Sequence, residues 1–143
     1  MSEIEEFKKV IRRLRAEDGC PWDREQTHSS LKGDIMEEAA EVICGINVYE
    51  ETGNAESMMD ELGDLLLQVV MESEIASEEG LFDFEDVARN VKEKMIRRHP
   101  HVFGNVRADT TEEVLKNWAE IKSGEKSGKE WMEPRYRRPS TKP

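Results

Sequence analysis

Hydrophobic residues recur along much of the chain at spacings of three and four, the pattern of one apolar face on an α-helix. Glycine or proline interrupts the pattern at Gly53, Gly80 and Pro100, as expected where helices end. The second helix should begin at Thr27 or Ser29, whose hydroxyl groups can cap it. The pattern predicts helices over about residues 4–14, 27–52, 55–79, 84–98 and 110–121, with loops at 22–26 and 101–109.

These segments favour an all-α fold with a four-helix-bundle-like core of antiparallel helices and a short extra C-terminal helix. Aromatic residues make up only 6% of the chain and β-branched residues do not cluster, which argues against an all-β fold. The folded domain is expected to span residues 1–126. Residues 127–143 are expected to form a basic tail, flexible or docked on a partner, because cationic residues there lie among Gly, Ser and Pro.

The balance of acidic and basic residues limits the classes of function that the chain can have. With 32 acidic against 21 basic residues the chain carries a formal charge of −11, which argues against a general nucleic-acid binder and permits a site that gathers cations. Cys20 and Cys44 form no C-x-x-C pair, so a reducing cytoplasm is the expected setting. The longest apolar run, at 65–71, is far too short to span a bilayer, and no membrane association is expected.

Two predicted helices each carry a pair of carboxylates three residues apart, Glu38 with Glu41 and Glu61 with Asp64. At about 100° per residue, each pair lies at the margin of an apolar stripe. Like charges at this spacing destabilise a helix by roughly 0.2–0.5 kcal/mol, and by more when partly buried. A divalent cation held between the pairs would reverse that effect, and an all-oxygen site suits Mg²⁺ or Mn²⁺. The alternative is a solvated acidic face.

Basic residues close the fourth predicted helix at Lys94, Arg97 and Arg98. They could simply complement the helix dipole, or they could hold phosphate, since arginine offers a planar fork to phosphoryl oxygens. Trp118 is either a core or interface aromatic or a ring that stacks on a base. Two further cations that could reach phosphate are Lys32 and Lys122.

Six sequence segments, taken in their order along the chain, resemble those of a known protein family, and the resemblance covers about residues 4–126. They are CPWDREQTH at 20–28, EEAAE at 37–41, DELGDLLLQVV at 60–70, EGLFDF at 79–84, KMIRRHPHVF at 94–103 and WAEIK at 118–122. In these segments the chain resembles the MazG family of nucleoside triphosphate pyrophosphohydrolases. The resemblance implies an all-α core that dimerises through its helices and Mg²⁺-dependent cleavage of a nucleoside triphosphate to a nucleoside monophosphate and pyrophosphate.

The resemblance also implies roles for individual residues. The family's metal-binding carboxylates fall on Glu38, Glu41, Glu61 and Asp64, and its nucleotide contacts fall on Glu37, Lys94, Arg97, Arg98 and Trp118. Glu37 or Glu41 is the candidate general base for an attacking water. A homodimer or higher homo-oligomer is expected. Two alternatives stay open: a related all-α enzyme that hydrolyses dUTP or phosphoribosyl-ATP, and a non-catalytic acidic helical interaction module.

Overall fold

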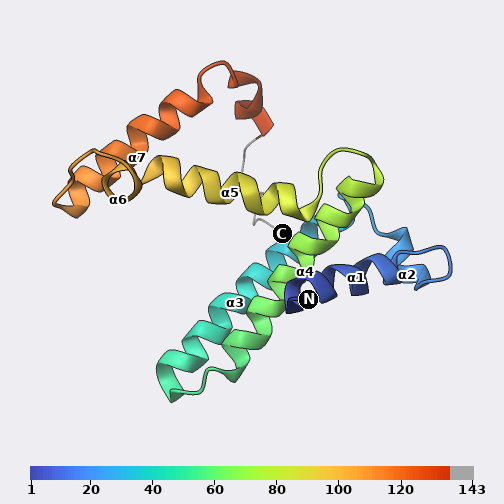
Figure 1. Cartoon of the computed structure of the whole chain (residues 1–143). Helices are drawn as coiled ribbons and strands as arrows, with labels where there is room; N and C mark the ends of the chain where they lie inside the picture. Colours follow the sequence, from blue (N-terminus) through green and yellow to red (C-terminus); the bar gives the residue numbers. More distant parts are fainter. Residues whose placement is uncertain (136–143) are drawn as a thin grey trace. The chain divides into compact units, whose positions relative to one another are not determined.

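The computed structural model describes residues 1–135, and this part of the chain is α-helical with no strand, which confirms the all-α prediction (Figure 1). A single 3₁₀ helix follows the last α-helix of the described part. The elements are α1 (Glu3–Leu14), α2 (Pro21–Glu25), α3 (Lys32–Thr52), α4 (Glu56–Glu78), α5 (Phe84–Arg98), α6 (Pro100–Phe103), α7 (Thr111–Lys126) and η1 (Glu130–Arg135).

The first of two compact units spans Met1–Ala88, and its centre is the helical hairpin of α3 and α4. Helix α1 packs against α4. The core of this unit lies where α1, the start of α3 and the second half of α4 meet, and it consists of Ile11, Leu31, Val70, Met71 and Ile75. The α3–α4 hairpin therefore has a well-buried end at this core and a more exposed end at its turn.

A glycine allows α3 and α4 to approach closely. A Cβ atom added at Gly45 would lie 2.9 Å from the Cα of Met58, so no larger residue fits there without backbone movement. At the turn, Gly53 has φ 75°, the left-handed conformation that commonly ends a helix. The side chain of Asn54 then accepts a hydrogen bond from the backbone N–H of Glu56 at 2.9 Å. These contacts fix the spacing of the two helices that carry the predicted carboxylates.

The prediction of a loop at residues 22–26 is wrong, because α2 occupies Pro21–Glu25. Proline favours the first position of a helix, where its missing N–H has no partner to lose. The second predicted helix also starts later than expected, at Lys32. Thr27 and Ser30 instead form a turn in which each side-chain oxygen accepts a hydrogen bond from the other residue's backbone N–H, at 2.9 and 3.1 Å.

The second compact unit begins at Arg89 and contains most of α5 together with α6, α7 and η1. Helix α6, again with a proline at its first position, replaces the start of the predicted loop at 101–109, and the loop is confirmed at 104–109. Thr110 caps α7, and its side chain accepts a hydrogen bond from the backbone N–H of Glu113 at 3.2 Å. Helix α7 extends beyond the predicted short helix to Lys126, and η1 lies within the predicted tail. The tail residues 136–143 lie outside the described residues.

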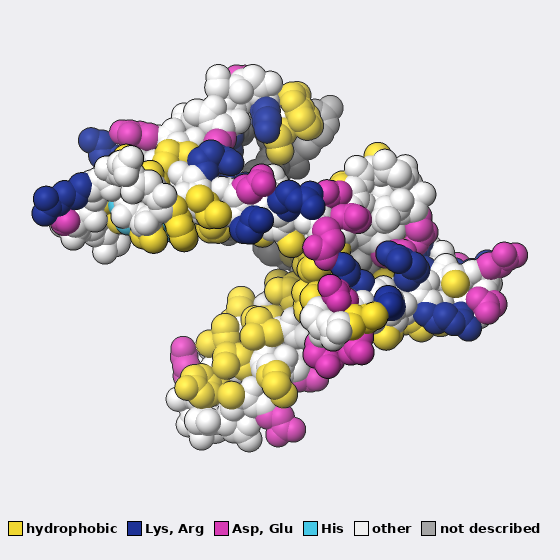
Figure 2. All heavy atoms as spheres, viewed as in Figure 1, with side chains coloured by type: hydrophobic (Ala, Val, Ile, Leu, Met, Phe, Trp, Pro, Cys, Tyr) yellow, Lys and Arg dark blue, Asp and Glu magenta, His cyan; other side chains and the backbone are white. Residues whose placement is uncertain are grey.

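Much of the apolar surface of α3 and α4 is exposed. Figure 2 shows hydrophobic side chains gathered over these helices. On α4, four exposed apolar residues follow one another at spacings of three, four and three, as in a coiled-coil seam. They are Met59, Leu62, Leu66 and Val69. We call them the α4 stripe. Within the described part of the chain, every helix is too short or too polar to cross a bilayer.

Candidate active site

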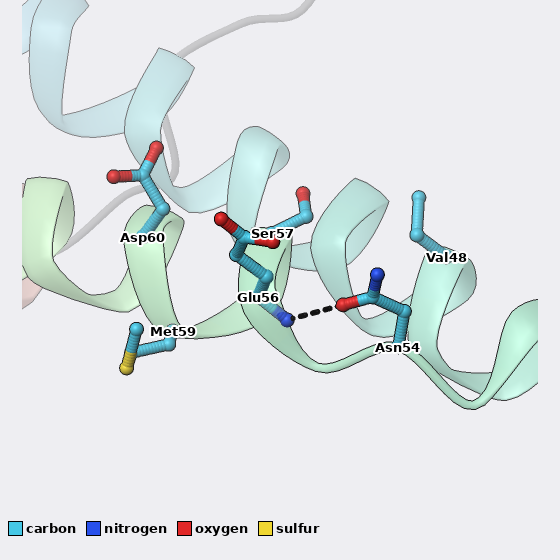
Figure 3. Close-up of a pocket in the computed structure, with 6 residues that line it drawn as sticks. All are labelled: Val48, Asn54, Glu56, Ser57, Met59 and Asp60. Atoms are coloured by element: carbon cyan, nitrogen blue, oxygen red, sulfur yellow. Dashed lines mark hydrogen bonds between the residues drawn. The ribbon is translucent and has the colours of Figure 1, made fainter.

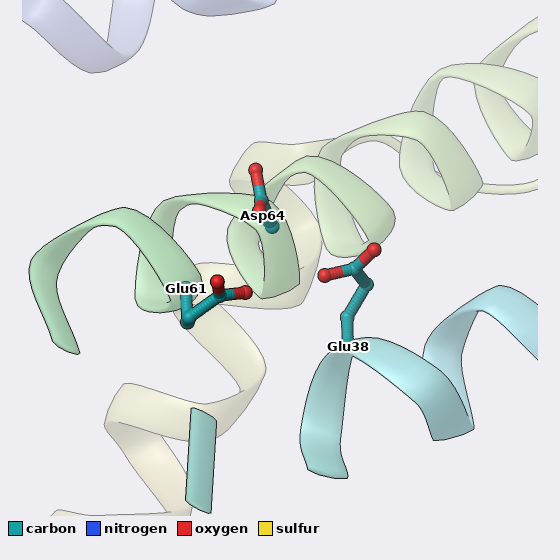
Figure 4. Close-up of side chains that lie close together, drawn as sticks. All are labelled: Glu38, Glu61 and Asp64. Carbon is teal, nitrogen blue, oxygen red and sulfur yellow. The ribbon is translucent and has the colours of Figure 1, made fainter. Parts of the chain in front are cut away.

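Three carboxylates converge between α3 and α4. Figure 4 shows Glu38 of α3 facing Glu61 and Asp64 of α4. One oxygen from each side chain lies within 4.8 Å of the oxygens from the other two, and all three residues are partly exposed. Glu61 and Asp64 share a face because residues three apart on a helix are neighbours. Glu38 reaches them because the hairpin holds α3 alongside α4.

The cluster opposes its own ionisation. Burial, followed by the charges of Asp64, Glu37 and Glu41, raises the pKa of Glu38. Burial, followed by the charges of Asp64 and Glu41, also raises the pKa of Glu61. An oxygen-only donor set with excess negative charge fits a hard divalent cation such as Mg²⁺ or Mn²⁺, which removes the repulsion by binding. The residues present therefore fit the metal that the sequence implies.

The other acidic residues predicted for the site lie on α3, outside this cluster. Glu37 and Glu41 are both exposed. The charge of Glu41 acts on both Glu38 and Glu61, whereas that of Glu37 acts on Glu38. The structure thus brings together three of the four predicted metal ligands and keeps the fourth within electrostatic reach. Lys32 is exposed at the first position of α3.

A basic pocket lies in the second unit, between α5 and the end of α7. Its volume is about 370 Å³. The predicted phosphate-binding residues Lys94, Arg97 and Arg98 line it from α5, and Lys122 lines it from α7. The remaining lining residues are Asn90, Glu125, Lys126, Lys129 and Met132. A cavity lined by cations at this density suits a polyanion such as a triphosphate.

Glu125 is a residue of this pocket that sequence reasoning missed. Its carboxylate accepts hydrogen bonds from Arg97 Nε at 3.1 Å and from Arg98 Nε at 3.0 Å. Burial favours a higher pKa for Glu125, but the hydrogen bonds and charges of the two arginines outweigh it and lower the pKa. A sequence signal was present, because Trp118, Lys122 and Glu125 recur at the four- and three-residue spacing of one helix face.

Trp118 contacts one of these two arginines, Arg98. The guanidinium carbon of Arg98 lies 5.2 Å from the centroid of the indole ring, within cation–π range. The ring of His99 meets the indole edge-on at 5.1 Å, and His99 Nδ1 donates to the Met95 carbonyl at 2.6 Å. Trp118 therefore orients Arg98 in this structure. Its predicted stacking on a nucleotide base stays a prediction.

A second hollow lies at the α3–α4 turn and does not suit an anionic substrate. Figure 3 shows the side chains that line it, including the carboxylates of Glu56 and Asp60, and the cap of Glu56 by Asn54. Its volume is about 550 Å³, yet no Lys or Arg is among its lining residues in the described part of the chain. Negative charge without a cation would repel phosphate.

Comparison with known proteins identifies a family for the central part of the chain. The model of the MazG nucleotide pyrophosphohydrolase domain matches residues 26–103. The chain is 47% identical over 126 residues to the nucleoside triphosphate pyrophosphohydrolase/pyrophosphatase MazG of Thermotoga maritima, covering 88% of this chain and 46% of that protein. It is 41% identical over 130 residues to the nucleoside triphosphate pyrophosphohydrolase of Escherichia coli K12, covering 90% of this chain and 48% of that protein.

The name of another relative states no activity. The uncharacterized protein YabN of Bacillus subtilis is 45% identical over 128 residues, which cover 90% of this chain and 25% of that protein. The chain therefore spans about half or less of the length of these relatives.

The raised pKa values of Glu38 and Glu61 predict how pH and metal act on stability. A carboxyl with a raised folded-state pKa favours folding when protonated, so stability is lost as pH rises from the unfolded pKa through the folded one. A divalent cation binds the ionised carboxylates. We therefore expect Mn²⁺ to raise the unfolding temperature at about pH 7.5 and to have little effect near pH 4, measured by scanning calorimetry.

The matched variants are Asp64→Asn in the cluster and Glu56→Gln on the same helix outside it. Each removes one negative charge from α4. Asp64→Asn should lose the Mn²⁺-dependent rise and Glu56→Gln should keep it. An equal rise in both variants, or the same rise at both pH values, would contradict a metal site at the cluster.

Proposed function

This chain belongs to the MazG nucleotide pyrophosphohydrolase family, and on that premise we propose that it hydrolyses nucleoside triphosphates to nucleoside monophosphates and pyrophosphate. The observation that carries the proposal is the convergence of the Glu38, Glu61 and Asp64 carboxylates across the α3–α4 hairpin. Removal of unwanted nucleotides from the cellular pool is the expected role. A cytoplasmic setting agrees with the two free thiols, Cys20 and Cys44.

The proposed metal ligands are Glu38, Glu41, Glu61 and Asp64, with Mg²⁺ as the cation and Mn²⁺ as a substitute. When bound, the cation would polarise phosphoryl oxygens and lower the pKa of a coordinated water. Glu37 or Glu41 is the proposed base that accepts the proton of the attacking water. This assignment is supported by their positions on α3, since Glu37 precedes Glu38 directly, Glu41 follows it by three residues, and both lie outside the oxygen cluster.

The proposed nucleotide contacts lie in the basic pocket. Lys94, Arg97 and Arg98 would neutralise the charge that develops on the departing pyrophosphate, a role supported by their shared cavity. Trp118 is the proposed stacking partner for the base, and Lys32 and Lys122 are proposed further phosphate contacts. The substrate alternatives, dUTP and phosphoribosyl-ATP, use the same phosphate chemistry and differ in the base and sugar that must be recognised.

We also propose that two copies pair through the α4 stripe. Met59, Leu62, Leu66 and Val69 present a seam of apolar side chains that the described part of the chain leaves exposed. Such a seam on a soluble chain is typical of a helix–helix interface. Exposed apolar residues on α3, among them Ile43 and Ile46, would widen the interface.

Leu66→Asp tests the pairing. A charge in the seam would be desolvated by a partner helix, so the variant should be a monomer where the wild-type chain is a dimer or higher oligomer. Leu115→Asp, at an exposed leucine of α7, is the control and should leave the mass unchanged. Sedimentation velocity at micromolar concentration measures both. A monomeric wild-type chain, or a Leu66→Asp variant with the wild-type mass, would contradict the interface.

Hydrolysis is tested with a panel of ribo- and deoxynucleoside triphosphates, dUTP and phosphoribosyl-ATP in Mg²⁺ and Mn²⁺, with products identified by chromatography. We expect monophosphate and pyrophosphate. Glu38→Gln and Asp64→Asn should lower kcat by roughly a hundredfold or more, because a ligand to the charge-stabilising metal is lost. Glu56→Gln should retain activity, and circular dichroism should show that all three variants fold.

The outcomes separate the alternatives. Turnover of dUTP or phosphoribosyl-ATP alone would favour those enzymes. Failure of every nucleotide to yield pyrophosphate would favour the non-catalytic interaction module. Wild-type turnover in Glu38→Gln or Asp64→Asn would refute the assignment of the carboxylates.

A further inference from the structure

We propose that Glu125 is an internal competitor for phosphate in the basic pocket. Its carboxylate engages the guanidinium groups of Arg97 and Arg98 that the phosphate chain of a substrate would use. The proposal deepens the proposed function, because it takes pyrophosphate as the anion that must leave this pocket. It assigns to Glu125 a role in weakening anion binding and so in product release.

The geometry matches that of a bound phosphoryl group. Arg97 donates from Nε and Nη2 to Glu125 Oε1, at 3.1 and 2.5 Å, and Arg98 donates from Nε to Oε2 at 3.0 Å. Arg98 Nε also donates to Oε1 at 3.4 Å, so the two guanidinium groups share that oxygen and Arg98 holds Oε2 as well. Phosphate and carboxylate both present paired oxygens to the arginine fork, so one can replace the other on the same donors.

Charge and burial make the competition effective. Among the described residues that line the pocket, Glu125 is the single carboxylate beside six cationic side chains, Lys94, Arg97, Arg98, Lys122, Lys126 and Lys129. The side chains of Arg98 and Glu125 are only 12% and 20% exposed, so solvent screens their attraction less than it screens a surface ion pair. The lowered pKa of Glu125 keeps the competitor ionised at neutral pH.

A purely structural role for the same contacts makes the opposite prediction. If Glu125 only braces the two arginines, its loss should let the guanidinium groups move and should weaken anion binding. If Glu125 competes, its loss should free three N–H donors for the ligand, Nε and Nη2 of Arg97 and Nε of Arg98, and should tighten binding. The sign of the change in affinity therefore distinguishes the two roles.

The probe is inorganic pyrophosphate without divalent metal, titrated calorimetrically into the full chain. Glu125→Gln keeps the size of the side chain and removes its charge. We expect its Kd for pyrophosphate to fall roughly three- to tenfold relative to wild type, because one repulsive charge next to the ligand is lost. Glu120→Gln, an exposed position of the same helix, is the matched control and should change Kd by less than about twofold.

A second variant covers the case in which Glu125→Gln does not fold. Glu125→Asp keeps the charge but shortens the side chain, so its hydrogen bonds to the arginines should weaken. Pyrophosphate should then bind more tightly than in wild type. Weaker or unchanged binding in whichever of the two variants folds would overturn the proposal. The readout needs no turnover, so a chain that fails to hydrolyse nucleotides still gives a decisive result here.

Discussion

Repulsion between like charges at the α3–α4 hairpin is the constraint on which the interpretation of this protein depends. Glu38, Glu61 and Asp64 bring their oxygens within 4.8 Å of one another, and the raised pKa values of Glu38 and Glu61 reflect burial and mutual repulsion. The close approach of the helices at Gly45 holds this arrangement in place. A fold that concentrates negative charge in this way gains free energy from any divalent cation it binds.

The two units carry complementary chemistry. The carboxylates proposed to hold a metal lie in the first unit, and the cations proposed to bind a polyphosphate lie in the second. Metal ions and basic side chains are the two means by which proteins meet the negative charge of a nucleoside triphosphate. Glu125 adds a further feature to the second unit, because an ion pair already occupies the arginines that a phosphate would require.

The sequence predicted the long helices and the spacing of the carboxylates well, because both depend on the regular period of an α-helix. It failed at the short helices α2 and α6, each of which has a proline as its first residue, and Pro100 was interpreted as a break. It also placed the start of α3 too early, because the hydroxyl groups of Thr27 and Ser30 cap each other instead of the helix. Such choices depend on local hydrogen bonds that periodicity does not encode.

In the candidate site, too, the sequence predicted what depends on helical spacing and missed what depends on contacts between distant residues. Helical spacing placed Glu61 beside Asp64, and the basic end of a predicted helix, together with the resemblance to the family, indicated Lys94, Arg97 and Arg98. Neither could show that Glu125 binds two of these cations, since that contact joins residues 27 and 28 positions apart in the sequence. The sequence also could not show that Glu38 meets the carboxylates of α4, because that contact depends on how the two helices of the hairpin pack.

The most direct test of a metal at the hairpin is anomalous X-ray diffraction from crystals grown with Mn²⁺. We predict a strong anomalous peak within about 2.5 Å of carboxylate oxygens from both helices, with Glu38, Glu61 and Asp64 among the ligands. Side chains that stay apart with no peak between them at saturating Mn²⁺ would contradict the central claim.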